Sequence, residues 1–585
     1  MLLEIRKKYC RAYGICLFIF LFFNDLCGQK NFHQPMEIPV LLSATFGELR
    51  DNSLHAGLDF RTQGVTGHRV FSSEKGYVSR IGVSPTGYGN VVYIAHPNGY
   101  TTVYAHLDAF NDEIAKYVRQ EQYRQERFAV NLYPNPALLP VGRGDVIGLS
   151  GNTGSSSGPH LHFEVRNTET QEPLNPLLFG FGVRDNVPPD IQRLAIYPMG
   201  EGSTVNGSSR RLILDLVRSG NTYRIAGNTN LTIKGSVAFG IETTDQTTGS
   251  TNRCGPYNIR LWIDSAMMFS QTMDRFAFDE SRYVNSLIDY EYYISNRVRL
   301  NRLFIQPNNQ LRVYDRHINR GIVAFPDQGN HRVLIIVSDF HDNNSRLEFN
   351  FNYLPGEQSP PSALPRIPSA LPFSGASEPM YKKEFVHQQD GIRILIPADA
   401  LYDEIAFTCT VSGIPQGLYS RSYRIHNPNT PLHTAMTIEI DASNLPQRLR
   451  EKALIVQIDS NGRRSSVGGS YRNGVVSAAS RVFGDFAIGV DTIPPRITPV
   501  NIRNGADMRN VRTISFRITD DFSGIATYNG RINGQWALFE YDAKTNHLFY
   551  NFDADRLTRN TQHTLELKVT DTKGNTAEYR ASFTW

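Results

Sequence analysis

The sequence predicts a mainly β protein built from several domains. Apolar and polar residues alternate with period 2 in many runs, such as 392–396 and 454–458, and this alternation is typical of strands that bury one face. Aromatic residues, which strands favour, are plentiful at 28 Tyr and 33 Phe. A length of 585 residues predicts roughly three to five domains. We expect an N-terminal antiparallel β-sheet domain with a helical insertion, followed by about three β-sandwich-like modules.

The composition excludes several classes of protein. Hydrophobic residues make up 40% and charged residues 20%, which argues against global disorder and against a polytopic membrane protein. The net charge of +4 lacks the clustered basic excess of nucleic-acid binders, so no nucleic-acid partner is expected. Beyond the first 27 residues only Cys254 and Cys409 remain, so a disulfide framework is not expected.

The first 28 residues have the pattern of a secretory signal peptide. A basic lead at 6–11 precedes an apolar run at 15–23, which is far shorter than the ~20 residues of a spanning helix. We expect cleavage after Gly28; a lipid anchor on Cys27 and an uncleaved anchor are the alternatives. No later stretch is long and apolar enough to cross a bilayer. The mature chain is therefore expected to be soluble and to lie outside the cytoplasm.

A repeated motif divides the rest of the chain. Asp185-Asn186-Val187-Pro188-Pro189 reappears as Asp491-Thr492-Ile493-Pro494-Pro495, and alternating runs follow each copy. Double prolines favour an extended chain, and period-2 runs predict strands. We therefore expect two diverged immunoglobulin-like β modules at 185–354 and 491–585. Chance similarity between generic β sequences is the alternative.

Between these modules the sequence predicts a linker and a third module. Residues 355–376 are rich in Pro and Ser, which is typical of linkers, and 377–490 again alternates as strands do. Histidines are scattered singly through the three modules, and none of the modules shows ligand-type residues at short spacing. We therefore expect the chemistry of the chain at 29–184, where seven of the 15 His lie.

The first candidate motif in this domain is His55-Ala56-Gly57-Leu58-Asp59. Because Gly57 disfavours a regular helix, we expect a strand entered from a loop, with both polar side chains turned toward one site. An imidazole nitrogen and a carboxylate oxygen are a normal pair of zinc ligands. This spacing alone also arises often by chance.

The second candidate motif is His160-Leu161-His162. The alternation around it predicts a half-buried strand, which places both His on one face about 7 Å apart. One of them can then bind a metal while the other reaches the metal-bound water or a substrate. Two structural histidines are the alternative.

The third candidate is His106, at the end of a predicted hairpin with arms at 91–95 and 100–106. Alternation predicts Thr102, Tyr104 and His106 on a common face. Taken alone, His106 could be a structural histidine rather than a functional one. The remaining histidines of this domain, His33, His68 and His96, we interpret as structural.

An insertion is expected at 111–140. Its first half, 112–127, carries Ile114, Tyr117 and Val118 at helical spacing, and its second half is rich in Pro and irregular. The insertion could wall a substrate groove or cover the site; a plain surface excursion is the alternative.

An ordered set of motifs runs through residues 38–180: Phe46-Gly47, His55-Ala56-Gly57-Leu58-Asp59, Gly87-Tyr88-Gly89-Asn90, Asn98-Gly99-Tyr100, Tyr104-Ala105-His106-Leu107, Gly144-Asp145, Gly158-Pro159-His160-Leu161-His162-Phe163-Glu164 and Asn175-Pro176-Leu177. Together they resemble the lysostaphin/LytM-type zinc metallopeptidases, which carry the duplicated hybrid motif and cut peptide cross-links in bacterial peptidoglycan. The resemblance makes 29–184 a metallopeptidase domain and says nothing of the C-terminal modules. Compact members of the family have a short loop where 111–140 is inserted.

The resemblance implies that His55, Asp59 and His162 hold one Zn²⁺ per chain, with water in the fourth position. Three protein ligands and one open position form the catalytic zinc pattern, in which the metal lowers the pKa of bound water to about 7. His106 and His160 match the two catalytic histidines of the family, and their separate roles stay open.

The function that the resemblance implies is an exported zinc metalloendopeptidase that hydrolyses peptidoglycan stem-peptide cross-links through a zinc-activated water. The leader and the architecture then favour the periplasm or cell envelope of a bacterium, with a Gram-negative one expected. Glu164, on the strand face of His162, is a candidate for supporting that ligand. One alternative is a non-catalytic LytM-type binding or activator protein that regulates other cell-wall hydrolases. Another is an adhesin or scaffold, in which the C-terminal modules bind a protein or glycan partner.

Overall fold

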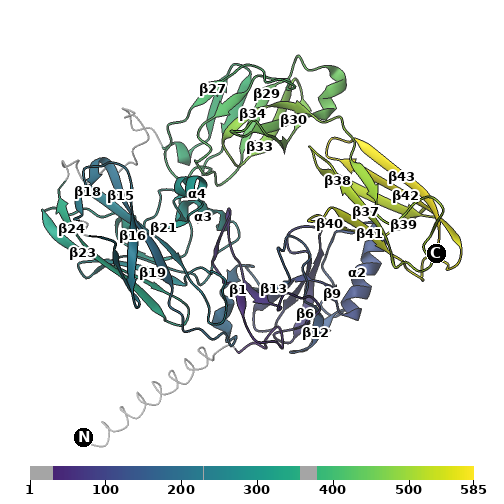
Figure 1. Ribbon diagram of the computed structural model, residues 1–585, viewed down its shortest axis with the longest axis horizontal. Helices are drawn as coiled ribbons and strands as arrows, with labels where there is room; N and C mark the ends of the chain where they lie inside the picture. Colours follow the sequence, from purple (N-terminus) through teal and green to yellow (C-terminus); the bar gives the residue numbers. More distant parts are fainter. Residues whose placement is uncertain (1–30, 228–229, 356–378) are drawn as a thin grey trace, which may run out of the picture.

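The computed structural model describes residues 31–227, 230–355 and 379–585. The expected signal peptide at 1–28 and nearly all of the expected linker at 355–376 lie outside these residues. Strands predominate among the described elements, so the prediction of a mainly β fold is confirmed. Figure 1 shows four β-rich units arranged in a ring, with the last unit beside the first. Within the described residues no helix has both the length and the apolar composition needed to cross a membrane.

The N-terminal unit is built on a nine-stranded sheet with the order β1-β4-β13-β8-β7-β6-β10, to which β11 and β14 add at β6 and β13. Its elements are β1 (Leu42–Ala44), β2 (Leu49–Arg50), β3 (Ser53–Leu54), β4 (Leu58–Arg61), β5 (Arg69–Phe71), β6 (Gly76–Val83), β7 (Asn90–Ala95), β8 (Tyr100–Leu107), β9 (Ala109–Phe110), α2 (Asp112–Gln125), β10 (Val130–Leu132), β11 (Pro140–Val141), β12 (Val146–Leu149), β13 (His160–Asn167), β14 (Pro173–Leu174) and a 3₁₀ turn, η2 (Pro176–Phe179).

The core of this unit lies between the large sheet and a small sheet of β5, β12 and β9. Leu161, Phe163 and Val165 of β13 alternate into this core, as the sequence predicts. Strand β13 lies between β4 and β8, with His162 paired opposite Asp59 on one side and Ala105 on the other. The register of the central strands therefore places the polar face of β13 next to both other candidate motifs.

The insertion is partly as expected. Helix α2 begins after Asn111, whose side chain accepts from the N–H of Ile114 at 3.0 Å, and it buries Ile114 and Val118. The second half of the insertion was predicted to be irregular. This prediction was wrong at both ends of that half, which form strands. Strands β10 and β11 both pair with β6, because the long β6 exposes an edge that needs hydrogen-bond partners.

The second unit is a ten-stranded sheet with the order β21-β18-β15-β16-β17-β24-β23-β19-β20-β22. Its elements are β15 (Asp190–Val205), β16 (Leu212–Ser219), β17 (Thr222–Ile225), β18 (Thr232–Thr244), β19 (Asn258–Ile263), β20 (Ala266–Thr272), η3 (Ser281–Tyr283), α3 (Val284–Leu287), α4 (Tyr290–Asn296), β21 (Leu300–Arg302), β22 (Tyr314–His317), η4 (Asn319–Gly321), β23 (Gly329–Ser338) and β24 (Asn344–Leu354). All ten strands are linked by hydrogen bonds, because β17 and β18 both pair in parallel with β24, and the sandwich-like nature of this module stays a prediction.

The third unit contains two five-stranded sheets, β25-β26-β29-β33-β32 and β27-β28-β34-β30-β31, and the last unit contains sheets β35-β37-β41-β40 and β36-β43-β42-β38-β39. The elements of the third unit are η5 (Met380–Lys382), β25 (Phe385–Gln389), β26 (Ile392–Ile396), β27 (Cys409–Val411), β28 (Tyr423–Ile425), β29 (Met436–Asp441), η6 (Gln447–Lys452), β30 (Ala453–Ile458), β31 (Arg464–Gly468), β32 (Ser470–Arg472), β33 (Val475–Ser480) and β34 (Gly484–Val490). Those of the last unit are β35 (Arg496–Pro499), β36 (Ala506–Asp507), β37 (Thr513–Thr519), β38 (Ile525–Ile532), β39 (Gln535–Ala537), β40 (Phe539–Asp542), β41 (His547–Asn551), β42 (Gln562–Asp571) and β43 (Thr576–Thr584).

The repeated sequence motif forms the same local structure twice. Asp339 accepts hydrogen bonds from the N–H groups of His341 and Asn343 at 2.9 and 2.8 Å. The side-chain amide of Asn343 donates both to Asp339 and to the Asp185 carbonyl. Equivalent bonds join Asp571, Lys573, Asn575 and Asp491. The shared junction supports a common origin of the two modules, and their immunoglobulin-like nature stays a prediction.

The ring closes where the last unit contacts the exposed face of α2. Arg119 forms an ion pair with Asp553, and the Tyr123 ring lies 5.2 Å from that of Trp536, edge to face. The guanidinium of Arg556 lies 4.0 Å from the centre of the Tyr123 ring. The insertion therefore serves as the docking surface for the C-terminal unit.

Replacing both Arg119 and Tyr123 by Ala is expected to open the ring. Each lost aromatic or cation–π contact weakens docking by about 0.5–2 kcal/mol, while the buried face of α2 is untouched. Small-angle X-ray scattering should show a larger radius of gyration than for the wild-type chain. Lys116→Ala, on an exposed position of the same helix, is the matched control. Unchanged scattering of the double variant would show that these contacts do not hold the ring closed.

Candidate metal centre

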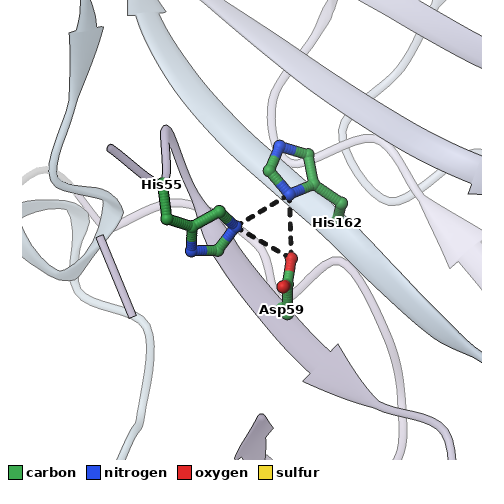
Figure 2. A group of neighbouring side chains, drawn as sticks. All are labelled: His55, Asp59 and His162. Carbon is green, nitrogen blue, oxygen red and sulfur yellow. Dashed lines mark hydrogen bonds and ion pairs between the residues drawn. The ribbon is translucent and has the colours of Figure 1, made fainter. Parts of the chain in front are cut away.

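Three buried side chains meet on the face of the central sheet opposite the core. His55 Nε2 lies 3.0 Å from Asp59 Oδ1 and 3.0 Å from His162 Nδ1 (Figure 2). The third side of the triangle, from His162 Nδ1 to Asp59 Oδ1, measures 2.8 Å. The structure thus brings together the three residues for which the resemblance implies a metal.

Local backbone geometry explains how His55 and Asp59 reach the same point. His55 lies in a loop, and the chain enters β4 at Leu58, so a strand entered from a loop is confirmed. Gly57 crosses β13 so closely that a Cβ there would lie 2.2 Å from the Phe163 carbonyl oxygen. Only glycine therefore lets the loop lie against β13 while Asp59 pairs with His162.

Each of the three side chains has a second partner behind it. The Nδ1–H of His55 donates to the Thr45 carbonyl at 2.8 Å, and the Nε2–H of His162 donates to Glu164 at 2.8 Å. Arg50 donates to the other oxygen of Asp59 at 2.7 Å. These bonds hold one ring nitrogen of each histidine away from the triangle, so the nitrogens that face Asp59 are the ones that can bind a metal.

The donor set suits a zinc ion. Two imidazole nitrogens and one carboxylate oxygen are normal zinc ligands, and tetrahedral bonds of about 2.0–2.2 Å would hold them roughly 3.3 Å apart, close to the spacing seen. Burial lowers the pKa of His162, but hydrogen bonds with Asp59 and Glu164 outweigh it and raise the pKa to about 9, so at neutral pH its Nδ1 binds either a proton or a metal ion. Burial likewise raises the pKa of Asp59, yet the two imidazoles hold it well below its usual range. The site therefore attracts positive charge.

His106 reaches this site through a β-bulge. The pairing of β7 with β8 shifts register beside His106, which adopts a left-handed φ of 61°. The prediction that Thr102, Tyr104 and His106 share a face was wrong, because the bulge breaks the alternation. The Thr102 and Tyr104 hydroxyls bond to each other at 2.9 Å in the interior. The His106 ring instead lies 4.8 Å from that of His160 and 5.9 Å from that of His162, between centroids.

Hydrogen bonds orient both flanking imidazoles. The Nδ1–H of His106 donates to the Thr153 carbonyl at 2.9 Å, and that of His160 to the Gly158 carbonyl at 2.8 Å. Each ring therefore carries its lone pair on Nε2. Burial, followed by the proximity of His162 and His160, lowers the pKa of His106 to about 3, so its ring is neutral at neutral pH.

A buried charge network lies behind His162. The Glu164 carboxylate is fully buried and accepts from His162, from Arg166 at 2.6 Å and from the Tyr88 hydroxyl. Burial raises the pKa of Glu164, but Arg166 and His162 outweigh it and lower the pKa to about 2. Sequence reasoning named Glu164 but missed Arg166, although its place two residues further on β13 predicts the same face. It also missed the role of Tyr88.

The second unit packs against the loop that leads to His55. The N–H of Leu54 donates to the Ser281 hydroxyl at 2.7 Å, and the Phe46 ring lies 5.0 Å from that of Phe276. A Cβ on Gly47 would lie 2.8 Å from Met273. Sequence reasoning missed this support because the two partners lie more than 200 residues apart.

The three histidines that we interpreted as structural lie apart from the triangle. His96 is buried and bonds to the Lys75 carbonyl at 3.0 Å and to Thr102 at 2.7 Å. His68 contacts the Thr62 carbonyl at 3.3 Å, and His33 contacts the neighbouring Gln34 carbonyl at 2.7 Å.

Comparison with known proteins separates two parts of the chain. Residues 379–491 match the family model of the Zu5-like domain.

The DD-carboxypeptidase/endopeptidase Mpg of Neisseria meningitidis serogroup B is 36% identical over 124 residues, which are 21% of this chain and 22% of the relative. The peptidoglycan DD-endopeptidase ShyA of Vibrio cholerae is 33% identical over 134 residues, which are 23% of this chain and 25% of the relative. The chain thus spans about a quarter or less of these relatives.

The catalytic domain of lysostaphin from Staphylococcus simulans is a similar solved structure. It is 24% identical and covers 24% of this chain and 91% of its own, with a TM-score of 0.18. The match that includes the candidate metal ligands is to the model of peptidase family M23, over residues 53–123 and 139–176. These ranges contain His55, Asp59, His106, His160 and His162. The N-terminal unit of this chain is a LytM-type domain of peptidase family M23.

Proposed function

We propose that the chain is an exported zinc metalloendopeptidase that hydrolyses peptide cross-links of bacterial peptidoglycan. The convergence of His55 Nε2, Asp59 Oδ1 and His162 Nδ1 within 3.0 Å, beside two further imidazoles, carries the proposal. The names of the relatives Mpg and ShyA support stem peptides as the substrate class. Their Neisseria and Vibrio sources support the envelope of a Gram-negative bacterium as the location.

The metal role follows from the ligand set. His55, Asp59 and His162 would hold one Zn²⁺ per chain. Bound zinc polarises a carbonyl oxygen and lowers the pKa of water in its open position to about 7. Thr45, Arg50 and the carboxylate behind His162 hold the three ligands in the orientation that a metal requires.

His106 and His160 supply the proton chemistry. The Nδ1 atoms of both rings bond to backbone carbonyls, which turns each Nε2 toward the site, and the lowered pKa of His106 keeps its Nε2 unprotonated at neutral pH. A neutral imidazole beside the metal ligands can accept the proton of an attacking water. Once protonated, an imidazole stabilises the oxyanion that forms at the scissile carbonyl and donates to the leaving amine. The pair is therefore suited to both steps of peptide hydrolysis.

A non-catalytic LytM-type activator of other cell-wall hydrolases is the alternative function. Loss of a metal ligand or of a flanking histidine would favour it. All five residues are present in this chain and lie together, which supports catalysis. A protein or glycan ligand of the C-terminal modules is compatible with either function.

His162→Ala is expected to remove both metal and activity. Without one of three ligands, bound zinc should fall from one per chain to almost none, and cleavage should fall by at least about 1,000-fold. Zinc content would be measured by mass spectrometry, and cleavage as loss of cross-linked dimers from purified peptidoglycan. His68→Ala, which alters a histidine of the same domain outside the site, should keep both. Full cleavage by His162→Ala would contradict the proposed mechanism.

His106→Ala is expected to separate metal binding from catalysis. His106 is not one of the three clustered ligand residues, so zinc should stay near one per chain. Loss of a proton-transfer group should lower kcat about 100- to 10,000-fold. The same zinc and cleavage measurements apply. A variant that loses its zinc together with its activity would show that His106 acts as a ligand instead.

Glu164→Gln is expected to weaken zinc binding 10- to 100-fold, the usual cost of losing the carboxylate behind a histidine ligand. Competition with a chromophoric chelator measures this affinity. Glu169→Gln, at an exposed position after the same strand, is the control. Tyr88→Phe removes one bond to Glu164 but keeps its charge, so it should fall between wild type and Glu164→Gln. Unchanged affinity of a folded Glu164→Gln protein would refute a supporting role.

A further inference from the structure

A second group of possible metal ligands lies between the first two units. It lines a small cavity together with Thr45 and Phe46, behind the loop that leads to the zinc-type site. The centre of a water-sized sphere can occupy about 20 Å³ of this cavity, which is room for one water molecule or ion. Three carboxylates and one imidazole face it: Asp185, Asp245, Asp339 and His341.

One side-chain atom each of Asp185, Asp339 and His341 lies within 4.8 Å of the other two. Asp339 is almost fully buried. The Nε2–H of His341 donates to the Val183 carbonyl at 3.0 Å, which leaves its Nδ1 with a lone pair. The group therefore concentrates acceptors around a space of ionic size.

Asp245 is the independent observation that points to a ligand. The residue is buried, with an exposed fraction of 6%, and its Oδ1 has no hydrogen-bond partner among the described residues. Burial and the neighbouring Asp339 and Asp185 raise the pKa of Asp245 to about 8. A buried carboxylate oxygen without a partner costs free energy, which a bound cation would offset.

We propose that Asp185, Asp245 and Asp339 bind one hard divalent cation of the calcium class at the junction of the first two units. Carboxylate oxygens are the ligands that such cations prefer, and three carboxylates without a matching basic side chain leave local negative charge to be compensated. His341 borders this site.

We do not propose a cation site at the corresponding group of acidic residues in the last unit. Asp491, Asp520 and Asp571 also lie together, and like Asp185 and Asp339 they accept hydrogen bonds from backbone N–H groups. The ammonium of Lys573 interacts with Asp571 and Asp491 and already supplies positive charge. Among the described residues of the two junctions, the first differs in that its buried oxygen without a partner belongs to a carboxylate, Asp245.

A cation at this junction would also brace the peptidase site. Thr45 lines the cavity, and its carbonyl oxygen accepts the hydrogen bond that orients His55. Phe46 lines the same cavity and packs on Phe276 of the second unit. The proposed cation would thus fix the wall that holds one zinc ligand in place.

Titration of Ca²⁺ into the full mature chain tests the proposal. The protein is first saturated with zinc and then freed of other metals, so that the peptidase site does not compete. Isothermal titration calorimetry should give one Ca²⁺ per chain, with a dissociation constant on the order of 10⁻⁴ M as in extracellular modules. Ca²⁺ should also raise the midpoint of thermal unfolding.

Asp245→Asn should lower the Ca²⁺ affinity at least tenfold and abolish the thermal shift. Asp185→Asn, at a less buried position, should do the same if the first variant folds poorly. Asp342→Asn removes the same charge from an exposed position next to the cluster and should bind Ca²⁺ as the wild type does. Zinc content and circular dichroism establish that each variant is folded.

Two outcomes would overturn the proposal. Wild-type protein that binds no Ca²⁺, or an Asp245→Asn protein that binds it normally, would show that Asp245 does not bind such a cation. A second equivalent of Zn²⁺ that needs Asp245, with no Ca²⁺ bound, would overturn the choice of a hard cation. Neither outcome depends on peptidase activity, so the proposal can fail while the proposed function stands.

Discussion

The N-terminal unit depends on one constraint: three ligand-type atoms are held within 3.0 Å of one another. These atoms are His55 Nε2, Asp59 Oδ1 and His162 Nδ1. Lone pairs repel, so such a triangle needs positive charge at its centre and firm support from behind. The chain supplies the support from three directions, through the carbonyl of Thr45, the guanidinium of Arg50 and the carboxylate of Glu164. The register of β13 against β4 sets the spacing, and a glycine lets the loop approach closely enough.

The units around the peptidase domain contribute to this support. The second unit packs on the loop from Phe46 to Leu54, and the cavity between the two units lies directly behind Thr45. On the other side the last unit docks on α2, and Lys544 donates to the carbonyl of Asn152, next to the residue that orients His106. His55 and His106 are therefore each oriented by a segment that contacts a neighbouring unit.

Much of the fold and site could be predicted from local patterns. Period-2 alternation predicts β13 and the face of His160, His162 and Glu164, and helical spacing predicts α2. The strict alternation rule fails at His106, because a bulge turns its side chain to the other face. Long-range partners leave no local pattern: Asp185 and Asp339 meet although 154 positions separate them, which the sequence numbers give directly. The pairing that joins β17 and β18 to β24 is equally non-local.

The most direct test of the account is an X-ray structure of the zinc-loaded chain with anomalous data collected on both sides of the zinc absorption edge. The account predicts one anomalous peak within about 2.0–2.2 Å of His55 Nε2, Asp59 Oδ1 and His162 Nδ1, the usual zinc–ligand distances. His106 and His160 should lie outside that ligand shell. A peak ligated by His106 or His160 in place of one of the three, or no zinc at this triangle in a fully loaded protein, would contradict it.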